Sequence, residues 1–479
     1  MPGPALLSAV RVLLAIAVIV SCHGCDRVRG AINDRLMQSA QAGDARSVYL
    51  CLLSGGDPNF RNGNGSTALH IAVSRDFGYV VDVLISEGAR PDERNREGRT
   101  ALHLASQPRL AKKLLAAGAA LDPRDENGAT PLMWHIASGN DDGAIALIAA
   151  GADIHVHRND GLTPLHLATR QTELARLLLD RGADIHARSR RGDTPLHLAV
   201  AGGRTEAIVL LLARGADLHA RNHTGNTALH VAAAEGNTEA GELLLTRGAD
   251  SNVRNDIGES PLHMAAALDR TEIIDLLLSR GADLQARTRD GNTALHVAAS
   301  AGQRKACELL LTRGAAPNAG NNAGDTPVVV AAAAGKAEII DVLVTNGAKR
   351  DLDPRDRNGA TPLMRHIASG EADEATALIA AGADVRARRN DGLTPLHLAT
   401  GQAAVARLLL DRGADPNARS NAGDTPLVFA ASAGRAEIIG LLLSRGATPG
   451  LTNNSGITAR QIAEGAGHRE AARLLAEDR

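Results

Sequence analysis

Aromatic residues are almost missing from this chain of 479 residues. It contains one Trp, two Tyr and three Phe, or 1% of the sequence. Proteins that bind single-stranded nucleic acid stack the bases on aromatic side chains, and small-molecule pockets are commonly lined by aromatic residues. The composition therefore argues against both kinds of site.

The chain also lacks a net charge of either sign. Its 52 Lys and Arg residues face 54 Asp and Glu residues, which gives a formal charge of −2. Such a balance provides neither a basic field for nucleic acid nor an acidic tail. Hydrophobic residues make up 44% of the chain, enough for a folded core. Because aromatics are scarce, that core must consist of Leu, Ile, Val and Ala, which favours small, closely packed helices.

Motifs of enzymes and metal sites are missing as well. The sequence has no phosphate-binding glycine loop with its Lys, no His-Glu-x-x-His motif, no set of paired Cys-x-x-Cys motifs, and no recognisable nucleophile setting. We therefore expect no enzyme activity, no cofactor and no metal. Cys51 and Cys307 lie inside apolar helical runs and are expected to be small buried hydrophobic residues.

The first 21 residues have the pattern of a signal peptide. Arg11 precedes the nine-residue apolar run Val12–Val20, which is too short to span a bilayer. The run ends in Ile-Val-Ser-Cys and resembles the lipobox of bacterial lipoproteins, which implies cleavage before Cys22 and lipid attachment there. Cys25 is a poorer candidate. Plain secretion, an uncleaved anchor and an incorrect start of the chain remain open, and residues 22–30 would form the anchor's linker.

After residue 30 the sequence repeats itself. A tetrad similar to Thr-Pro-Leu-His recurs at intervals of 30 to 35 residues, most often 33. Its first residues are Thr67, Thr100, Thr130, Thr163, Thr194, Thr227, Ser260, Thr293, Thr326, Thr361, Thr394, Thr425 and Thr458.

One repeat illustrates the local physics. Thr194 is suited to cap a helix and Pro195 to occupy its first turn. Leu196, Leu198 and Ala199 are expected to form a buried stripe, and a second helix follows after Gly202-Gly203. Glycine then ends the second helix, and a polar hairpin of about a dozen residues leads to the next tetrad. No single repeat can bury its own apolar face, so neighbours must complete the core.

These tetrads and their spacing resemble the ankyrin-repeat family over residues 31–479. The resemblance implies an all-α solenoid of about fourteen repeats, with an N-terminal cap at 31–60 and a C-terminal cap at 453–479. It also implies binding of a protein partner through the inner helices and hairpin tips, without catalysis.

An internal duplication provides a comparison within the chain. Residues 122–169 and 353–400 are identical at 38 of 48 positions, at an offset of 231. Residues 140–143 and 371–374, between the helices, carry several of the differences, as do residues 155–157 and 386–388 in the hairpin. Drift on exposed loops and retargeting of a binding edge both remain open.

Histidine is frequent, but most of it has a structural explanation. Eight histidines hold the fourth tetrad place, where the resemblance implies hydrogen bonds to local backbone and Thr hydroxyls: His70, His103, His166, His197, His230, His263, His296 and His397. His155, His186 and His219 lie eight residues before a tetrad, where other repeats have Asn. Hydrogen bonding between hairpins and a metal or pH-sensing role both remain open for these three.

Arginine recurs six residues before the tetrads. The members of this arginine row are Arg61, Arg94, Arg124, Arg188, Arg221, Arg254, Arg287, Arg355, Arg388 and Arg419. The row is expected either to pair with nearby Asp125, Asp160, Asp290 and Asp356 or to form an electrostatic track for an acidic partner or anionic surface. Trp134, replaced by Arg365 in the duplicate, is expected to be at least partly exposed and to anchor a partner or pack half-buried.

Together these features predict a non-catalytic protein-interaction scaffold, held by lipid at Cys22 in the outer membrane or periplasm of a bacterial envelope. We expect a monomer that does not bind nucleic acid and that meets the membrane only through its anchor. A secreted host-directed effector and a structural spacer of the envelope remain as alternatives.

Overall fold

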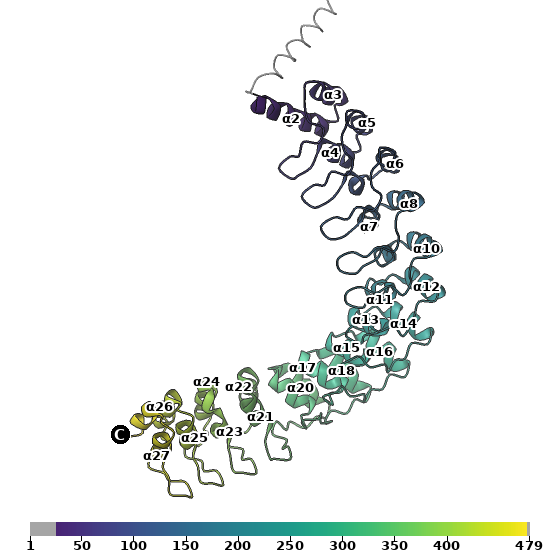
Figure 1. Cartoon of the computed structure of the whole chain (residues 1–479). Helices are drawn as coiled ribbons and strands as arrows, with labels where there is room; N and C mark the ends of the chain where they lie inside the picture. Colours follow the sequence, from purple (N-terminus) through teal and green to yellow (C-terminus); the bar gives the residue numbers. More distant parts are fainter. Residues whose placement is uncertain (1–24, 477–479) are drawn as a thin grey trace, which may run out of the picture. The chain divides into compact units, whose positions relative to one another are not determined.

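The computed structural model describes residues 25–476, and it consists of helices joined by turns (Figure 1). Contacts divide the chain into two parts, a first part that ends at His223 and a second that begins at Thr224. Residues 25–476 contain no strand, only an isolated antiparallel bridge between Thr452 and Thr458. The predicted signal peptide and Cys22 lie outside the described residues.

Each repeat contributes two helices, which we call its first and second helix. In the first part the first helices are α2 (Cys25–Ala42), α4 (Ala68–Ser74), the 3-10 helix η1 (Ala101–Leu104), α7 (Pro131–Ser138), α9 (Pro164–Leu167) with η2 (Ala168–Arg170), and α11 (Pro195–Ala201). The second helices are α3 (Ala45–Leu53), α5 (Gly78–Ser86), α6 (Pro108–Ala116), α8 (Asp141–Ala149), α10 (Thr172–Asp180) and α12 (Thr205–Ala213).

The second part continues the same alternation. Its first helices are α13 (Ala228–Glu235), α15 (Pro261–Ala267), α17 (Ala294–Ala301), α19 (Pro327–Ala333), α21 (Pro362–Ser369), α23 (Pro395–Leu398) with η3 (Ala399–Gly401), α25 (Pro426–Ser432) and α27 (Ala459–Gly465). Its second helices are α14 (Thr238–Thr246), α16 (Thr271–Ser279), α18 (Arg304–Thr312), α20 (Ala337–Thr345), α22 (Ala372–Ala381), α24 (Ala403–Asp411), α26 (Ala436–Ser444) and α28 (Arg469–Leu474).

The tetrads begin the first helices, as predicted. In α11 the cap Thr194 has extended backbone angles, its side chain accepts from the backbone of His197, and the His197 ring accepts from the N–H of Thr194. Pro195 occupies the first turn, where a missing N–H costs nothing. The shorter repeats have a shortened first helix, because η1 and the pairs α9–η2 and α23–η3 replace regular two-turn helices.

Helices of successive repeats stack in register. First helices contact first helices, as in α13–α15–α17, and second helices contact second helices, as in α14–α16–α18. Within the sample repeat Leu196, Ala199 and Val200 are buried as part of this stack. Leu198, predicted to be buried, is only half-buried. Residues in the place of Leu198 form the candidate site described below.

One junction departs from the regular stack. This junction is the 35-residue repeat between Thr326 and Thr361. Here the first helix α19 packs mainly against α22, which is a second helix. The extra residues lie in the loop around Lys349–Asp353, as predicted from the tetrad spacing. The longer loop therefore shifts α21 and α22 relative to α19.

The N-terminal repeat begins earlier than the spacing suggested. Helix α2 starts at Cys25, so residues 25–30, predicted to be a linker, are helical. Residues 25–42 contain neither a Gly-Gly pair nor a Thr-Pro pair that would end or restart a helix, and α2 is 18 residues long. Neither α2 nor any other described helix combines the length and apolar character needed to cross a membrane.

Candidate functional site

A line of half-buried side chains runs along the first helices. The residue directly after each tetrad is half-buried in every repeat, which leaves one flank of each side chain open to solvent. We call this set the fifth-position column: Ile71, Leu104, Trp134, Leu167, Leu198, Val231, Met264, Val297, Val330, Arg365, Leu398, Phe429 and Ile462. All members except Arg365 are apolar.

Preceding repeats cover the other flank of the column. Leu167 packs against Ala129, Met133 and Val156. Leu398 packs in the same way against the duplicate residues Ala360, Met364 and Ala387. Phe429 meets the ring of His397 edge-on, with ring centroids 5.4 Å apart. The column is thus anchored by the fold, while each member remains partly exposed.

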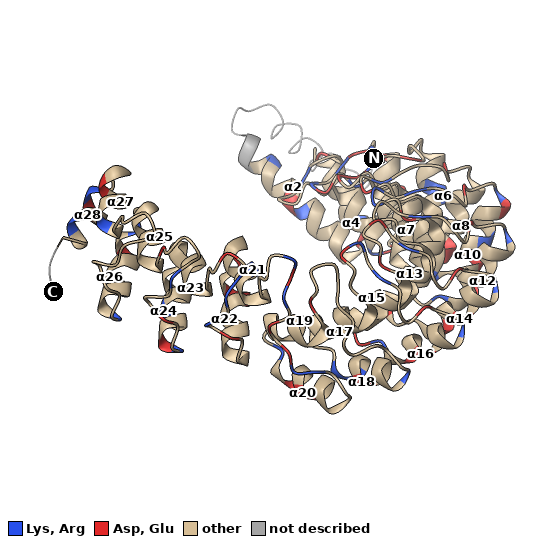
Figure 2. Ribbon diagram, turned by 90° about the horizontal axis from the view of Figure 1, so that it is seen from below, with Lys and Arg blue, Asp and Glu red and all other residues tan. Residues whose placement is uncertain are grey.

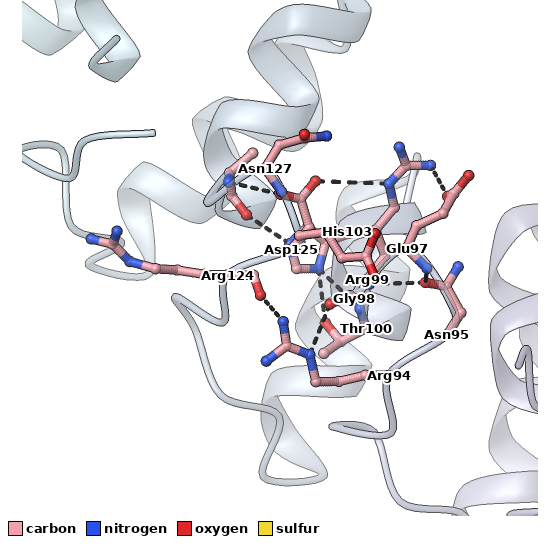
Figure 3. Close-up of polar contacts among 12 residues, drawn as sticks. Arg94, Asn95, Glu97, Gly98, Arg99, Thr100, His103, Arg124, Asp125 and Asn127 are labelled. Atoms are coloured by element: carbon pink, nitrogen blue, oxygen red, sulfur yellow. Dashed lines mark hydrogen bonds and ion pairs between the residues drawn. The ribbon is translucent and has the colours of Figure 1, made fainter. Parts of the chain in front are cut away.

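Trp134 is the largest member of the column in the first part. The guanidinium carbon of Arg99, from the preceding turn, lies 3.6 Å from the centroid of the Trp134 ring. Arg99 also forms an ion pair with Glu97 and lies 3.9 Å from a carboxylate oxygen of Asp125 (Figure 3). The ring is therefore held by a cation on one face while the residue remains half-buried. This confirms the partial exposure predicted for Trp134.

In the duplicate, a different pair occupies the same place. Arg365 replaces Trp134 and forms an ion pair with Asp325, which precedes its tetrad just as Arg99 does. A cation over a ring in the first part thus corresponds to an ion pair in the second. Neither Arg99 nor Asp325 was predicted from the sequence. Both directly precede a tetrad, so a comparison of that place between repeats is the signal that could have identified them as neighbours of Trp134 and Arg365.

The arginine row connects neighbouring hairpins. Several members donate to the backbone carbonyl of the residue in the same place of the next repeat. Figure 3 shows one of these contacts, from Arg94 to the carbonyl of Arg124. The donor and acceptor pairs are Arg94–Arg124, Arg124–His157, Arg188–Arg221, Arg254–Arg287, Arg287–Gly320, Arg355–Arg388, Arg388–Arg419 and Arg419–Thr452. Arg61 instead pairs with Glu93. The row therefore has a structural task, and its part in partner binding stays a prediction.

Three of the four carboxylates predicted to pair with this row, Asp125, Asp160 and Asp356, have other partners. Asp125 and Asp356 accept backbone N–H groups of their own turns, and Asp160 pairs with Arg158. The guanidinium groups of the row instead use carbonyl oxygens of the stacked hairpins. Figure 2 shows basic and acidic residues interspersed along both parts.

The tetrad histidines are buried structural groups, as predicted. In the first complete repeat, Nδ1 of His70 accepts from the Thr67 N–H at 3.2 Å, and Nε2 donates to the carbonyl of Arg99 at 3.0 Å. The second bond reaches the turn before the next tetrad, so each ring links two repeats. The same pattern recurs at His103, His166, His263, His296 and His397. Burial lowers the pKa of His103 to about 4.

The hairpin histidines differ from the asparagines they replace. Asn252 donates to Gly281 O and accepts from the N–H of Asp283, and Asn417 bridges the next hairpin likewise. His155 and His186 are exposed, and the contact that the structure gives each is a backbone N–H bond to the nearby Asp153 or Asp184. The described residues hold no group of three or more side chains arranged to bind a metal.

The two described cysteines with side-chain detail fit the prediction. Cys51 and Cys307 are buried and unpaired. Burial raises the pKa of the Cys307 thiol to about 12, so it remains protonated at neutral pH. A thiol in this state is a poor nucleophile.

Comparison with known proteins agrees with this architecture. The family "Ankyrin repeats (3 copies)" matches residues 36–119, 106–189, 186–255, 242–321, 262–353, 308–389 and 328–420. The family "Ankyrin repeats (many copies)" matches residues 409–463. No curated protein matches the chain. Because the family matches extend over most of the sequence, and the paired helices and capped tetrads agree with them, the chain belongs to the ankyrin-repeat family.

Proposed function

We propose that the chain is a non-catalytic protein-binding scaffold that engages its partner along the first helices and hairpins. It is tethered by lipid at Cys22 to the outer membrane or periplasmic side of a bacterial envelope. The fifth-position column carries the proposal, because within each part it offers a series of half-exposed, mostly apolar side chains that the fold already holds in place. Apolar surface of this kind forms the centre of protein interfaces.

The form of the column favours a protein partner over a small molecule. Its members are distributed one per repeat, so they provide extended contact, and the hollow that Leu167 and Leu198 line is open to solvent. Affinity then comes from several repeats together, with the largest share from side chains that are large and preorganised. Trp134, clamped by Arg99, is the member of the first part that best meets this description.

The duplication supports two related but different contact sites. The first is apolar and aromatic around Trp134, and the second is charged around Arg365 and Asp325. The hairpins next to them also differ, since His155 and His157 correspond to Arg386 and Arg388. We propose that the first site takes an apolar partner side chain and that the second tolerates a polar one.

Site-specific photocrosslinking in intact cells tests the binding face. A photoreactive amino acid replaces Leu198 in the column or, as the matched control, Val209, an exposed residue of the second helix in the same repeat. We expect protein adducts from position 198 and none from position 209. Trp134→Ala should lower the adduct yield about tenfold, as expected for loss of an interface anchor. Equal yields from both positions would contradict the proposed face.

Palmitate labelling and cell fractionation test the tether separately. The full chain should carry the label and remain in the envelope fraction, whereas Cys22→Ser should lose the label. Release of the unlabelled wild type into the medium would instead support the secreted effector.

A further inference from the structure

The first repeat presents an unusual face. Its second helix, α3, exposes Tyr49, Leu50 and Leu53, with exposed fractions of 43%, 53% and 54%. With Arg46 these residues occupy positions i, i+3, i+4 and i+7, so they form one stripe along α3. We call this stripe the α3 face. Terminal repeats of such arrays normally present a polar outer surface.

The other repeats show which residues this place usually holds. The place of Leu53 at the end of the second helix is small or polar elsewhere: Ser86, Ala116, Ala149, Asp180, Ala213, Thr246, Ser279, Thr312, Thr345, Ala380, Asp411 and Ser444. The place of Leu50 is buried or half-buried in every later second helix. Leu50 is exposed because α3 belongs to the first described repeat, whereas Leu53 stands at a place where the other second helices carry small or polar residues.

The chain that leads into this repeat indicates what covers the face. Only His23 and Gly24 separate Cys22 from Cys25, where α2 begins. An extended chain spans at most about 3.5 Å per residue, so the start of α2 lies within about 11 Å of the Cα of Cys22. An acyl group at Cys22 would therefore hold the first repeat against the lipid head groups in every orientation.

The α3 face lies on the side of the repeat that this tether reaches. Helix α3 runs antiparallel to α2, and the side chain of Ile32 lies next to Gly56, just after the end of α3. Leu53 therefore lies at the end of α3 beside Ile32, which is seven residues, or about 10 Å, along α2 from Cys25. Tyr with Leu and Arg is a typical combination at the boundary between head groups and acyl chains.

We infer that the α3 face docks on the bilayer surface and orients the array on the membrane that holds it. This inference rests on the proposed lipid anchor at Cys22. The anchor supplies attachment, and burial of Tyr49, Leu50 and Leu53 among the head groups fixes which side of the first repeat faces the lipid. A second copy of the chain is the other candidate occupant, and the test separates it from the bilayer; the apolar run Val12–Val20 is left out of the tested form.

A chemical tether tests docking independently of whether cells lipidate the chain. Residues 22–479 with Cys25→Ser are coupled through Cys22 to a maleimide lipid in phosphatidylethanolamine–phosphatidylglycerol vesicles. Cys51 and Cys307 are buried and should not react. This form lacks Val12–Val20, so that segment cannot cover the face. Palmitate labelling of the full chain, described above, tests the natural anchor.

The readout is quenching of a single tryptophan by nitroxide-labelled lipid. Leu53→Trp is combined with Trp134→Phe, and the matched control is Asp180→Trp, the same place in α10, in the same background. We expect emission from position 53 to fall at least twofold and emission from position 180 to stay unchanged. Adding Leu50→Glu should abolish the quenching while the far-ultraviolet circular dichroism is retained.

Three results would overturn the inference. The first is equal emission from positions 53 and 180 with and without nitroxide lipid. The second is quenching that survives Leu50→Glu, because then proximity alone and not the α3 face would account for it. The third is a dimer of the untethered chain in sedimentation that Leu50→Glu dissolves, which would assign the face to a second copy.

Discussion

At pH 5 the folded chain should unfold at a clearly lower urea concentration than at pH 7.5. The cause is the set of buried tetrad histidines, whose rings accept at Nδ1 and donate at Nε2 and are therefore neutral in the folded state. Burial lowers the pKa of His70, His166, His263, His296 and His397, and it lowers that of His103 from 6.5 to about 4. A proton on Nδ1 would oppose the Thr N–H that already points at it.

The sign of the effect follows from proton uptake. Below pH 6.5 the histidines of the unfolded chain bind protons, whereas the buried rings of the folded chain stay neutral. The free energy of unfolding therefore falls as the pH falls. The stabilisation is complete above pH 6.5 and is lost progressively down to the lowered pKa values. His103 alone, with its pKa at about 4, should cost about 3 kcal/mol over this range.

The chain supplies its own control for this prediction. Met133 and Met364 hold the tetrad place of histidine in two repeats. His103→Met should therefore fold, with a shallower dependence of the unfolding free energy on pH between 6.5 and 5. Urea midpoints that agree at pH 7.5 and pH 5 in the wild type would contradict the structural role of these rings.

Gly258→Ala should destabilise the array far more than Gly281→Ala. Both glycines have positive φ, +82° and +83°. Ala at either place therefore lowers the free energy of unfolding by about 1–2 kcal/mol, because it must adopt the left-handed conformation. A Cβ at Gly281 meets nothing within 4 Å, whereas one at Gly258 would lie 2.7 Å from the backbone nitrogen of Arg289 in the next repeat. That nitrogen donates to the carbonyl of Ile257, so the clash also opens a bond between hairpins.

We expect a loss of about 3 kcal/mol or more for Gly258→Ala and about half as much or less for Gly281→Ala. Urea unfolding followed by circular dichroism measures both. Equal losses would show that neighbouring hairpins do not pack as closely as the structure indicates.

Much of the fold could be predicted because its signals are local and repeated. Thr194 and Pro195 determine where α11 begins without reference to the rest of the chain, and the same pair recurs along the sequence. The tetrad spacing also placed the long loop near Lys349. The role of His70 followed from the family resemblance, and the structure confirms it.

The remaining features depend on contacts between repeats. Leu198 has the same local pattern as a buried residue, and only the stacked structure shows that one of its flanks is open. The partners of the arginine row lie about one repeat away, so nearby carboxylates appeared to be better acceptors than the carbonyl of Arg287 or Gly320. The contact of α19 with α22 likewise depends on how a longer loop is accommodated.

Deletion of one whole repeat tests most directly whether each repeat is a unit that its neighbours complete. Removing residues 260–292 joins Glu259 to Thr293 and leaves every remaining tetrad in register. The control deletion, residues 260–276, removes α15 and part of α16 and destroys the register. We predict that the first variant keeps its circular dichroism per residue and a cooperative melt, and that the second loses both around the deletion. An in-register deletion that unfolds the chain, or an out-of-register deletion that leaves it unchanged, would contradict the account.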